Sequence, residues 1–398
     1  LVGCLEKHLG LRKGWLHSER FNAELERCPL ADAGPMPSLA DTLTPRFLGG
    51  VLRCCGSAAG EVGKAEMLAL KGLSSGAKAC VEAAQKEKIY VFGGSTCLLG
   101  EHLSTVEYFD PCKGVWQAAQ PMYFKRTGCV AGVIGRRIHV CGGPHELNRT
   151  VETFDIAREA WDTTWPAFRL GATRDAAAAA VVGGRFYICG GQDPSAGVAH
   201  RTVEFFDRGP DGGRLRGGML FGTMQQPRRH LAVAQMPGQG AMLMATGGAA
   251  TRWRNFDAKS NLAHASAEVL DLRKPDGCWK YMKSMAQRRL HHSLTAFKGE
   301  LYAAGGISGF QVLASVECWH AESGTWTSVR PLPVELGGHR MAVAGGRLHV
   351  FGGMLQVGMF APQAGEYQRF GPKVGEWDFA PGMLASRLSF CAVSVRLI

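Results

Sequence analysis

Six hydrophobic runs along the chain each end in a pair of glycines. The pairs are Gly93-Gly94, Gly142-Gly143, Gly190-Gly191, Gly247-Gly248, Gly305-Gly306 and Gly352-Gly353, and their first glycines are 49, 48, 57, 58 and 47 residues apart. A second apolar run precedes most pairs across a tight turn, such as Gly135-Arg136, which predicts a β-hairpin. A period near fifty residues built on such hairpins predicts a radial array of four-stranded blades.

A third predicted strand with a recurring sequence motif follows each hairpin. Residues 105–110 read Thr-Val-Glu-Tyr-Phe-Asp, and residues 150–155 read Thr-Val-Glu-Thr-Phe-Asp. A tryptophan comes next in most repeats, at Trp116, Trp161, Trp279, Trp326 and Trp377. The third repeat has no such tryptophan and carries a Gly/Arg-rich stretch at residues 209–218 instead.

With these features in phase over six units, the chain resembles the kelch-repeat β-propeller family and, within it, the kelch-like adaptor proteins. The resemblance covers residues 88 to 398. It implies that the glycines, the strand Glu and the Trp are scaffold. Glycine permits positive φ and close backbone approach, Trp supplies a large buried area between blades, and a buried Glu needs a hydrogen-bond partner.

We expect an all-β, six-bladed kelch β-propeller closed by a C-terminal strand. The last residues, 387–398, match the opening strand of a repeat, and the strand at residues 89–92 has no hairpin partner before it. Pairing these two strands would remove both open sheet edges. We therefore assign residues 88–398 to the propeller.

Residues 1–87 form a different segment, with helical spacing at 2–16, 19–28, 61–70 and 77–85. We expect a short helical or irregular N-terminal segment there. Its role is left open between a linking region, a helical packing segment and a leader. Because the chain begins with Leu1 rather than Met, a further domain before it also stays open.

Composition agrees with a large β core, since 46% of the residues are apolar and 53 are glycine. No apolar stretch is long enough to span a membrane and no signal peptide opens the chain, so we expect a cytoplasmic or nuclear protein without a membrane partner. Thirteen cysteines lack any Cys-x-x-Cys spacing. Those in predicted strands are expected to be reduced and to pack as small hydrophobic side chains.

The chain has a net charge of +11, and residues 88–398 contribute +10 of it. Residues 88–398 hold 34 of the 45 Lys and Arg but 24 of the 34 Asp and Glu. A basic surface favours an acidic partner. Because no patch alternates basic residues with stacking aromatics, we expect an acidic protein or peptide segment and no nucleic acid.

The glycine pairs also align a set of arginines. Counting 16 residues back from the first glycine gives Arg126, Arg174 and Arg289; the longer hairpin of repeat four gives Arg229; and the C-terminal strand begins at Arg387. Repeat six departs, with Leu336 at this position. The resemblance implies that such arginines line a central pocket for acidic peptides. The alternative is a structural pair with the recurring Glu.

The loop of repeat four is a second candidate contact. From the first glycine to the strand Glu it spans 21 residues, against 10 to 14 elsewhere, and it holds Arg252-Trp253-Arg254. Trp and Arg dominate binding hot spots. We interpret these three residues as partner-binding, the alternative being that Trp253 folds back into the core.

The search for catalytic chemistry favours a non-enzymatic protein. The sequence has no phosphate-binding loop, no His-Glu-x-x-His and no Gly-x-Ser-x-Gly. We expect no cofactor and no metal, with His291 and His292 on a strand pointing to opposite faces. A kelch-type metalloenzyme is the least favoured of three hypotheses.

The other two hypotheses are interaction modules. The first is a substrate receptor of a cullin-RING ubiquitin ligase, as the resemblance to kelch-like adaptors implies, with the ligase-binding part preceding Leu1. The second is an actin-binding or cytoskeletal scaffold protein.

Overall fold

The computed structural model describes residues 87–96, 100–145, 149–163, 169–208, 215–250, 263–274, 277–355, 367–371, 376–380 and 382–396. These residues form β-strands and loops without an α-helix, which confirms the all-β prediction. No helix within them is long and apolar enough to cross a lipid bilayer. The predicted N-terminal helical segment lies outside the described residues except for Glu87, which begins the first strand one residue before the predicted boundary.

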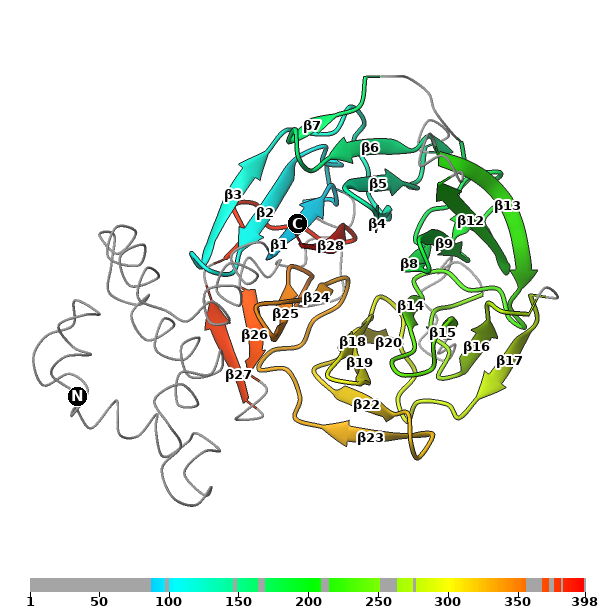
Figure 1. Cartoon of the computed structure of the whole chain (residues 1–398). Helices are drawn as coiled ribbons and strands as arrows, with labels where there is room; N and C mark the ends of the chain where they lie inside the picture. Colours follow the sequence, from blue (N-terminus) through cyan, green and yellow to red (C-terminus); the bar gives the residue numbers. More distant parts are fainter. Residues whose placement is uncertain are drawn as a thin grey trace, which may run out of the picture. The chain divides into compact units, whose positions relative to one another are not determined.

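The described strands form six four-stranded antiparallel sheets around one axis, the arrangement of a β-propeller (Figure 1). The first sheet, in the order β28-β1-β2-β3, contains Cys391–Arg396, Glu87–Phe92, Val106–Asp110 and Val115–Ala119. The second consists of β4 Val130–Ile134, β5 Arg137–Cys141, β6 Glu152–Asp155 and β7 Ala160–Trp161. The third consists of β8 Ala178–Val182, β9 Arg185–Cys189, β12 Thr202–Arg208 and β13 Leu215–Thr223.

The remaining three sheets follow in chain order. The fourth consists of β14 Ala232–Gln235, β15 Met242–Thr246, β16 Ala267–Asp271 and β17 Trp279–Met282. The fifth consists of β18 Ser293–Phe297, β19 Glu300–Ala304, β22 Val316–His320 and β23 Thr325–Val329. The sixth consists of β24 Arg340–Ala344, β25 Arg347–Phe351, β26 Tyr367–Gly371 and β27 Glu376–Ala380. Two small hairpins form separate two-stranded sheets, β10 Gln192–Asp193 with β11 Val198–Ala199 after β9, and β20 Ile307–Ser308 with β21 Gln311–Val312 after β19.

The last strand of the chain pairs with the first. β28 runs antiparallel to β1 with Phe92 opposite Cys391 and Glu87 opposite Arg396. The innermost strand of this sheet therefore comes from the C-terminus, as the apolar pattern of residues 387–398 predicts.

The glycine pairs join neighbouring sheets. The amide of Gly94 donates to the carbonyl of Arg126 at 2.7 Å, and both glycines of this pair have positive φ. A Cβ on Gly93 would lie 2.3 Å from the same carbonyl. Glycine is therefore required here by conformation and by the close approach of the next sheet.

A ring of backbone hydrogen bonds surrounds the axis just before the innermost strands. One residue of each sheet takes a positive φ there and donates its amide to the carbonyl of its counterpart in the preceding sheet, at 2.6 to 3.2 Å; the six are Gly128, Ala176, His230, His291, Gly338 and Ser389. The last bond of the series runs from Gly128 to Ser389. The series of hydrogen bonds therefore returns to its starting point.

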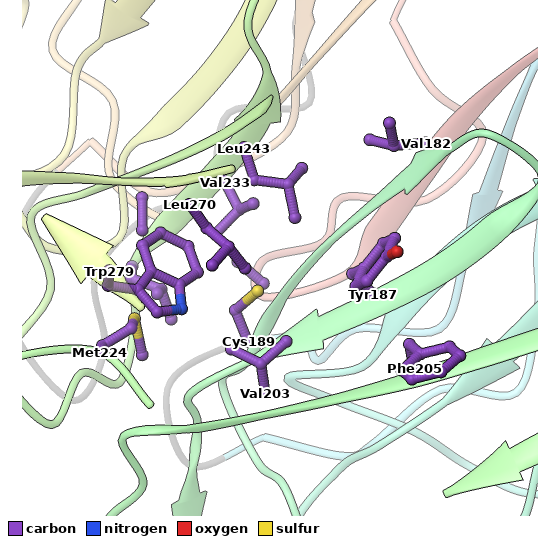
Figure 2. Close-up of a cluster of buried hydrophobic side chains, with 13 residues drawn as sticks. Val182, Tyr187, Cys189, Val203, Phe205, Met224, Val233, Leu243, Leu270 and Trp279 are labelled. Carbon is purple, nitrogen blue, oxygen red and sulfur yellow. The ribbon is translucent and has the colours of Figure 1, made fainter. Parts of the chain in front are cut away.

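The core lies between adjacent sheets. Figure 2 shows one cluster, in which Tyr187 and Val203 of the third sheet and Leu243 and Trp279 of the fourth are buried together. Trp161 likewise meets Phe92 of the preceding sheet edge-on, with ring centroids 6.0 Å apart. Contacts of this kind confirm that the recurring Trp packs one blade on the next. In the third sheet, which lacks the Trp, Phe221 of β13 packs edge-on against Tyr187 of β9 within the same sheet.

The described cysteines are free, and five of them are buried: Cys129, Cys141, Cys189, Cys318 and Cys391. Cys141 and Cys189 are fully inaccessible, and Cys129 Sγ lies 3.2 Å from Cys391 Sγ of the neighbouring inner strand. Free thiols in such apolar surroundings pack as small hydrophobic side chains.

Candidate interaction surface

Five of the six sheets contain a buried arginine paired with a buried glutamate. The arginine lies two residues before the ring of axial hydrogen bonds, and the glutamate is on the third strand of the same sheet. The pairs are Arg126–Glu152 and Arg174–Glu204 at 2.8 Å, Arg228–Glu268 at 2.8 Å, Arg289–Glu317 at 3.0 Å, and Arg387–Glu107.

The first of these pairs illustrates the geometry. Arg126 donates from Nε to Glu152 at 2.8 Å, from Nη1 to the carbonyl of Gly142 at 3.1 Å, and from Nη2 to the carbonyl of Thr150 at 3.0 Å. The second oxygen of Glu152 accepts the amide of Tyr123 at 2.6 Å, in the loop arriving from the preceding sheet. One buried ion pair thus ties three strands and an inter-sheet loop together.

Four of the predicted partner-binding residues take part in these pairs. The structure brings Arg126, Arg174, Arg289 and Arg387 around the axis, as predicted, but their side chains are at most 1% exposed. Burial lowers the pKa of Arg289, which Glu317 counteracts. The geometry supports the structural alternative, while direct binding of a partner by these side chains stays a prediction without geometric support.

The fifth predicted arginine, Arg229, requires a correction. The residue that matches the other four is Arg228, which donates to the carbonyl of Gly247 at 2.5 Å and pairs with Glu268. The hairpin turn between β14 and β15 is longer than in the other sheets, so counting back from the glycine pair misses the register by one residue. Arg229 instead forms a backbone bridge with Ala249.

The sixth sheet replaces both members of the pair. Leu336 lies two residues before Gly338 of the axial ring and is buried. In strand register, Gln368 is opposite Val350, as Glu107 is opposite Val91 in the first sheet. The position of the recurring Glu is therefore occupied by Gln368. The sixth sheet therefore lacks both the arginine and the glutamate of the pair.

The loop residues Arg252, Trp253 and Arg254 lie outside the described residues. The prediction that they bind a partner is therefore untested.

Histidines surround the axis beside the hydrogen-bonded ring. The imidazoles of His230 and His291 stack with centroids 3.6 Å apart and line a small cavity together with Arg340 and Ser389. Burial lowers the pKa of His291 to about 3 and that of His230 well below its usual value, so both rings are neutral near pH 7.

His292 lines the same cavity and also contacts the preceding sheet. Its Nε2 lies 2.9 Å from the hydroxyl of Thr246. The prediction that His291 and His292 lie on a strand with their side chains on opposite faces is not borne out, because both residues precede β18, which begins at Ser293, and both line the cavity. Sequence reasoning missed His230 because a histidine occupies this ring position in only two of the six sheets.

Exposed apolar side chains gather in the loops at the glycine-pair end of the sheets. Tyr123 is 55% exposed and Leu384 is 61% exposed, and each lies in a loop held by the recurring Glu of the next sheet. Val198 and Phe310 are exposed on the small hairpins that follow two of the glycine pairs. We call this end of the propeller the glycine-pair face.

Charged and polar side chains accompany this apolar set. Lys125 forms an exposed ion pair with Glu101, and Arg288 is exposed beside the buried Arg289. His102 and His145 lie 3.3 Å apart between Nδ1 and Nε2. Partial burial and the neighbouring His145 lower the pKa of His102. Exposed loops on a rigid scaffold are the usual site of recognition.

The arrangement of the six sheets defines the class of the protein as a β-propeller. The Kelch motif matches residues 83–123 and 288–333. The chain is 35% identical over 100 residues to Kelch-like protein 35 of Mus musculus, which covers 25% of this chain and 17% of that protein. It is 28% identical over 118 residues to Kelch-like protein 26 of Danio rerio, covering 30% and 19%.

A third relative is alpha-scruin of Limulus polyphemus, 31% identical over 139 residues, which are 35% of this chain and 14% of that protein. The chain thus carries kelch repeats and resembles the kelch-like adaptor proteins. Its matches span less than a fifth of the length of these relatives.

Proposed function

We propose that the propeller is a non-enzymatic protein-interaction module that binds an acidic protein or peptide on its glycine-pair face. The observation that carries this proposal is the group of exposed apolar side chains at this end, with Tyr123 and Leu384 on loops fixed by buried ion pairs and Phe310 on a small hairpin. The surplus of Lys and Arg in residues 88–398 favours an acidic partner.

We also propose that the six sheets are six blades of a closed ring. The pairing of β28 with β1 and the cyclic series of axial hydrogen bonds support this count. Closure makes the loop positions rigid, and a rigid surface binds at a lower entropic cost.

The cellular role that we propose is that of a substrate receptor for a cullin-RING ubiquitin ligase in the cytoplasm or nucleus. Similarity to Kelch-like protein 35 and to Kelch repeat and BTB domain-containing protein 12 supports it. The second candidate is an actin-binding or cytoskeletal scaffold, which rests on the similarity to alpha-scruin. Co-sedimentation with actin filaments separates the two roles.

Binding of the full chain to an array of acidic peptides, at low and high salt, tests the interaction face. We expect the double variant Tyr123→Ser with Leu384→Ser to lose at least tenfold in affinity. A matched control, Leu220→Ser with Tyr281→Ser, removes comparably exposed apolar groups from the outer strands β13 and β17 and should bind normally.

A second pair of variants tests the charge preference. Arg288→Glu reverses an exposed charge on the glycine-pair face and should weaken binding mainly at low salt, because exposed charges are screened. Lys298→Glu makes the same change in the exposed turn between β18 and β19, at the opposite end of the fifth sheet, and should have no effect. Equal affinity of all four variants would refute the proposed face.

A further inference from the structure

The fifth sheet brings a carboxylate, a thiol and an imidazole together. Glu300 begins β19, while Cys318 and His320 lie on β22, which pairs with it. The Nδ1 of His320 lies 2.6 Å from one oxygen of Glu300, and Cys318 Sγ lies 3.1 Å from the other. The three potential ligand atoms, one from each residue, all lie within 4.8 Å of one another.

Strand alternation explains this convergence. Cys318 and His320 are two residues apart, so their side chains leave the same face of β22. Tyr302 is opposite Cys318 in the register, which places Glu300 opposite His320 on that face. The three donors are thus held by two hydrogen-bonded strands.

The second and third sheets carry a different pair at these positions. In the second sheet Arg137 is opposite Asp155, with charged atoms 3.8 Å apart, and in the third sheet Arg185 and Asp207 are 3.5 Å apart. The fifth sheet exchanges the signs, with an acid on the second strand and a base on the third. The exchange, together with Cys318, converts a surface ion pair into a set of three metal-binding donors.

We propose that Glu300, Cys318 and His320 form a Zn²⁺ site with one open coordination position. Thiolate, imidazole and carboxylate are all ligands of zinc, a borderline-soft ion that tolerates mixed donors. One Zn²⁺ with one thiolate and one carboxylate is neutral overall, so binding leaves no uncompensated charge at this partly buried position.

Surrounding groups orient the donors. The Nε2 of His320 lies 2.7 Å from the hydroxyl of Thr327, a contact that leaves Nδ1 for the metal when Nε2 carries the proton. The hydroxyl of Tyr302 donates to Glu300 at 3.0 Å. Zn²⁺ binds the thiolate form of cysteine, so metal binding releases the thiol proton of Cys318.

Cobalt substitution and zinc stoichiometry of the full chain test the site. We expect Co²⁺ to produce a thiolate-to-cobalt charge-transfer band that is lost in Cys318→Ser and retained in Cys278→Ser, which removes an exposed cysteine outside the site. Dialysis against Zn²⁺ should leave one equivalent more on the wild type than on a double variant, Glu300→Arg with His320→Asp.

The double variant restores the Arg–Asp pair that the second and third sheets already use, so it is expected to fold with an unchanged melting temperature. It keeps the test decisive if Cys318→Ser misfolds. A cobalt band that survives in Cys318→Ser, or equal zinc content in the wild type and the double variant, would show that the three residues form only a hydrogen-bonded cluster and would overturn the proposal.

Discussion

The buried arginine–glutamate pairs define this protein at the scale of single residues. Each guanidinium joins strands of its own sheet, and each carboxylate also holds a loop from the sheet before it. Removing one member of such a pair leaves the other charge buried and unpaired, whereas removing both costs far less. The sixth sheet, with Leu336 and Gln368, is a natural example of the second case.

The fifth sheet allows a direct comparison of the two cases. We expect Glu317→Gln to lower the free energy of unfolding by about 3–5 kcal/mol, because Arg289 stays buried without its carboxylate. Adding Arg289→Leu, which copies the sixth sheet, should recover most of that loss. Urea denaturation measures both variants, and a double variant no more stable than Glu317→Gln would contradict the interpretation.

The axial histidines predict acid sensitivity. Burial lowers the folded-state pKa of His230, His291 and His292 below the value of 6.5 in an unfolded chain. Below pH 6.5 the unfolded state therefore binds more protons than the folded state, and stability falls as the pH falls. Each such histidine contributes up to about 1.4 kcal/mol per pH unit.

We expect His291→Asn to reduce the slope of the free energy of unfolding against pH between pH 6 and about 4. The variant should take up as much as one proton fewer on unfolding in this range. Asn tolerates the positive φ of this position. Thermal or urea denaturation at several pH values provides the measurement. An unchanged slope would mean that His291 does not resist protonation in the folded protein.

At the scale of elements, the glycine pairs determine how one sheet meets the next. The first glycine of a pair lies against a carbonyl of the following sheet, and the second donates its amide to the same carbonyl. Turn glycines at the other end of the sheets have positive φ but open surroundings. The positive φ alone explains why glycine occupies the turns. In the glycine pairs, both the positive φ and the close contact with the next sheet require glycine.

Two alanine substitutions separate these effects. In Gly190→Ala the new Cβ would lie 2.3 Å from the carbonyl of Arg228, whereas in Gly183→Ala no atom lies within 4 Å, and φ is about +60° at both positions. We expect Gly183→Ala to cost about 1–2 kcal/mol from φ alone. Gly190→Ala should cost about 1–3 kcal/mol more from overpacking. Equal losses in denaturation experiments would show that the inter-sheet contact relaxes freely.

At the scale of the whole molecule, the C-terminal strand completes the first sheet. β28 covers β1 over its full length and buries Cys391 and Val395. Without it β1 would present an open edge, which promotes aggregation.

A chain that ends at Phe390 should therefore lose its cooperative thermal transition and aggregate. The matched control lacks only Leu397 and Ile398, which follow β28, and should unfold like the full chain. Calorimetry and light scattering compare the two. A truncated chain that melts cooperatively at the wild-type temperature would show that closure by β28 is dispensable.

The repeat was readable from the sequence because each of its features has a local cause. Alternating apolar runs, glycine at positive φ and a Trp of fixed spacing all follow from strand geometry and packing between identical units. The site was less predictable. The spacing of the glycine pairs correctly predicted that Arg126 and Arg174 lie near the axis, but it does not determine the direction of their side chains. In repeat four the longer hairpin turn led the same spacing to Arg229 in place of Arg228.

Periodic hydrophobicity and glycine therefore determine the β architecture of this protein, because they act within a strand or a turn. Three properties depend on residues far apart in the chain: the burial of the arginines by Glu partners, the stacking of His230 on His291, and the convergence of Glu300 with Cys318 and His320. Only the tertiary structure decides them, because they depend on strand register and on the neighbours that a closed arrangement of sheets brings into contact.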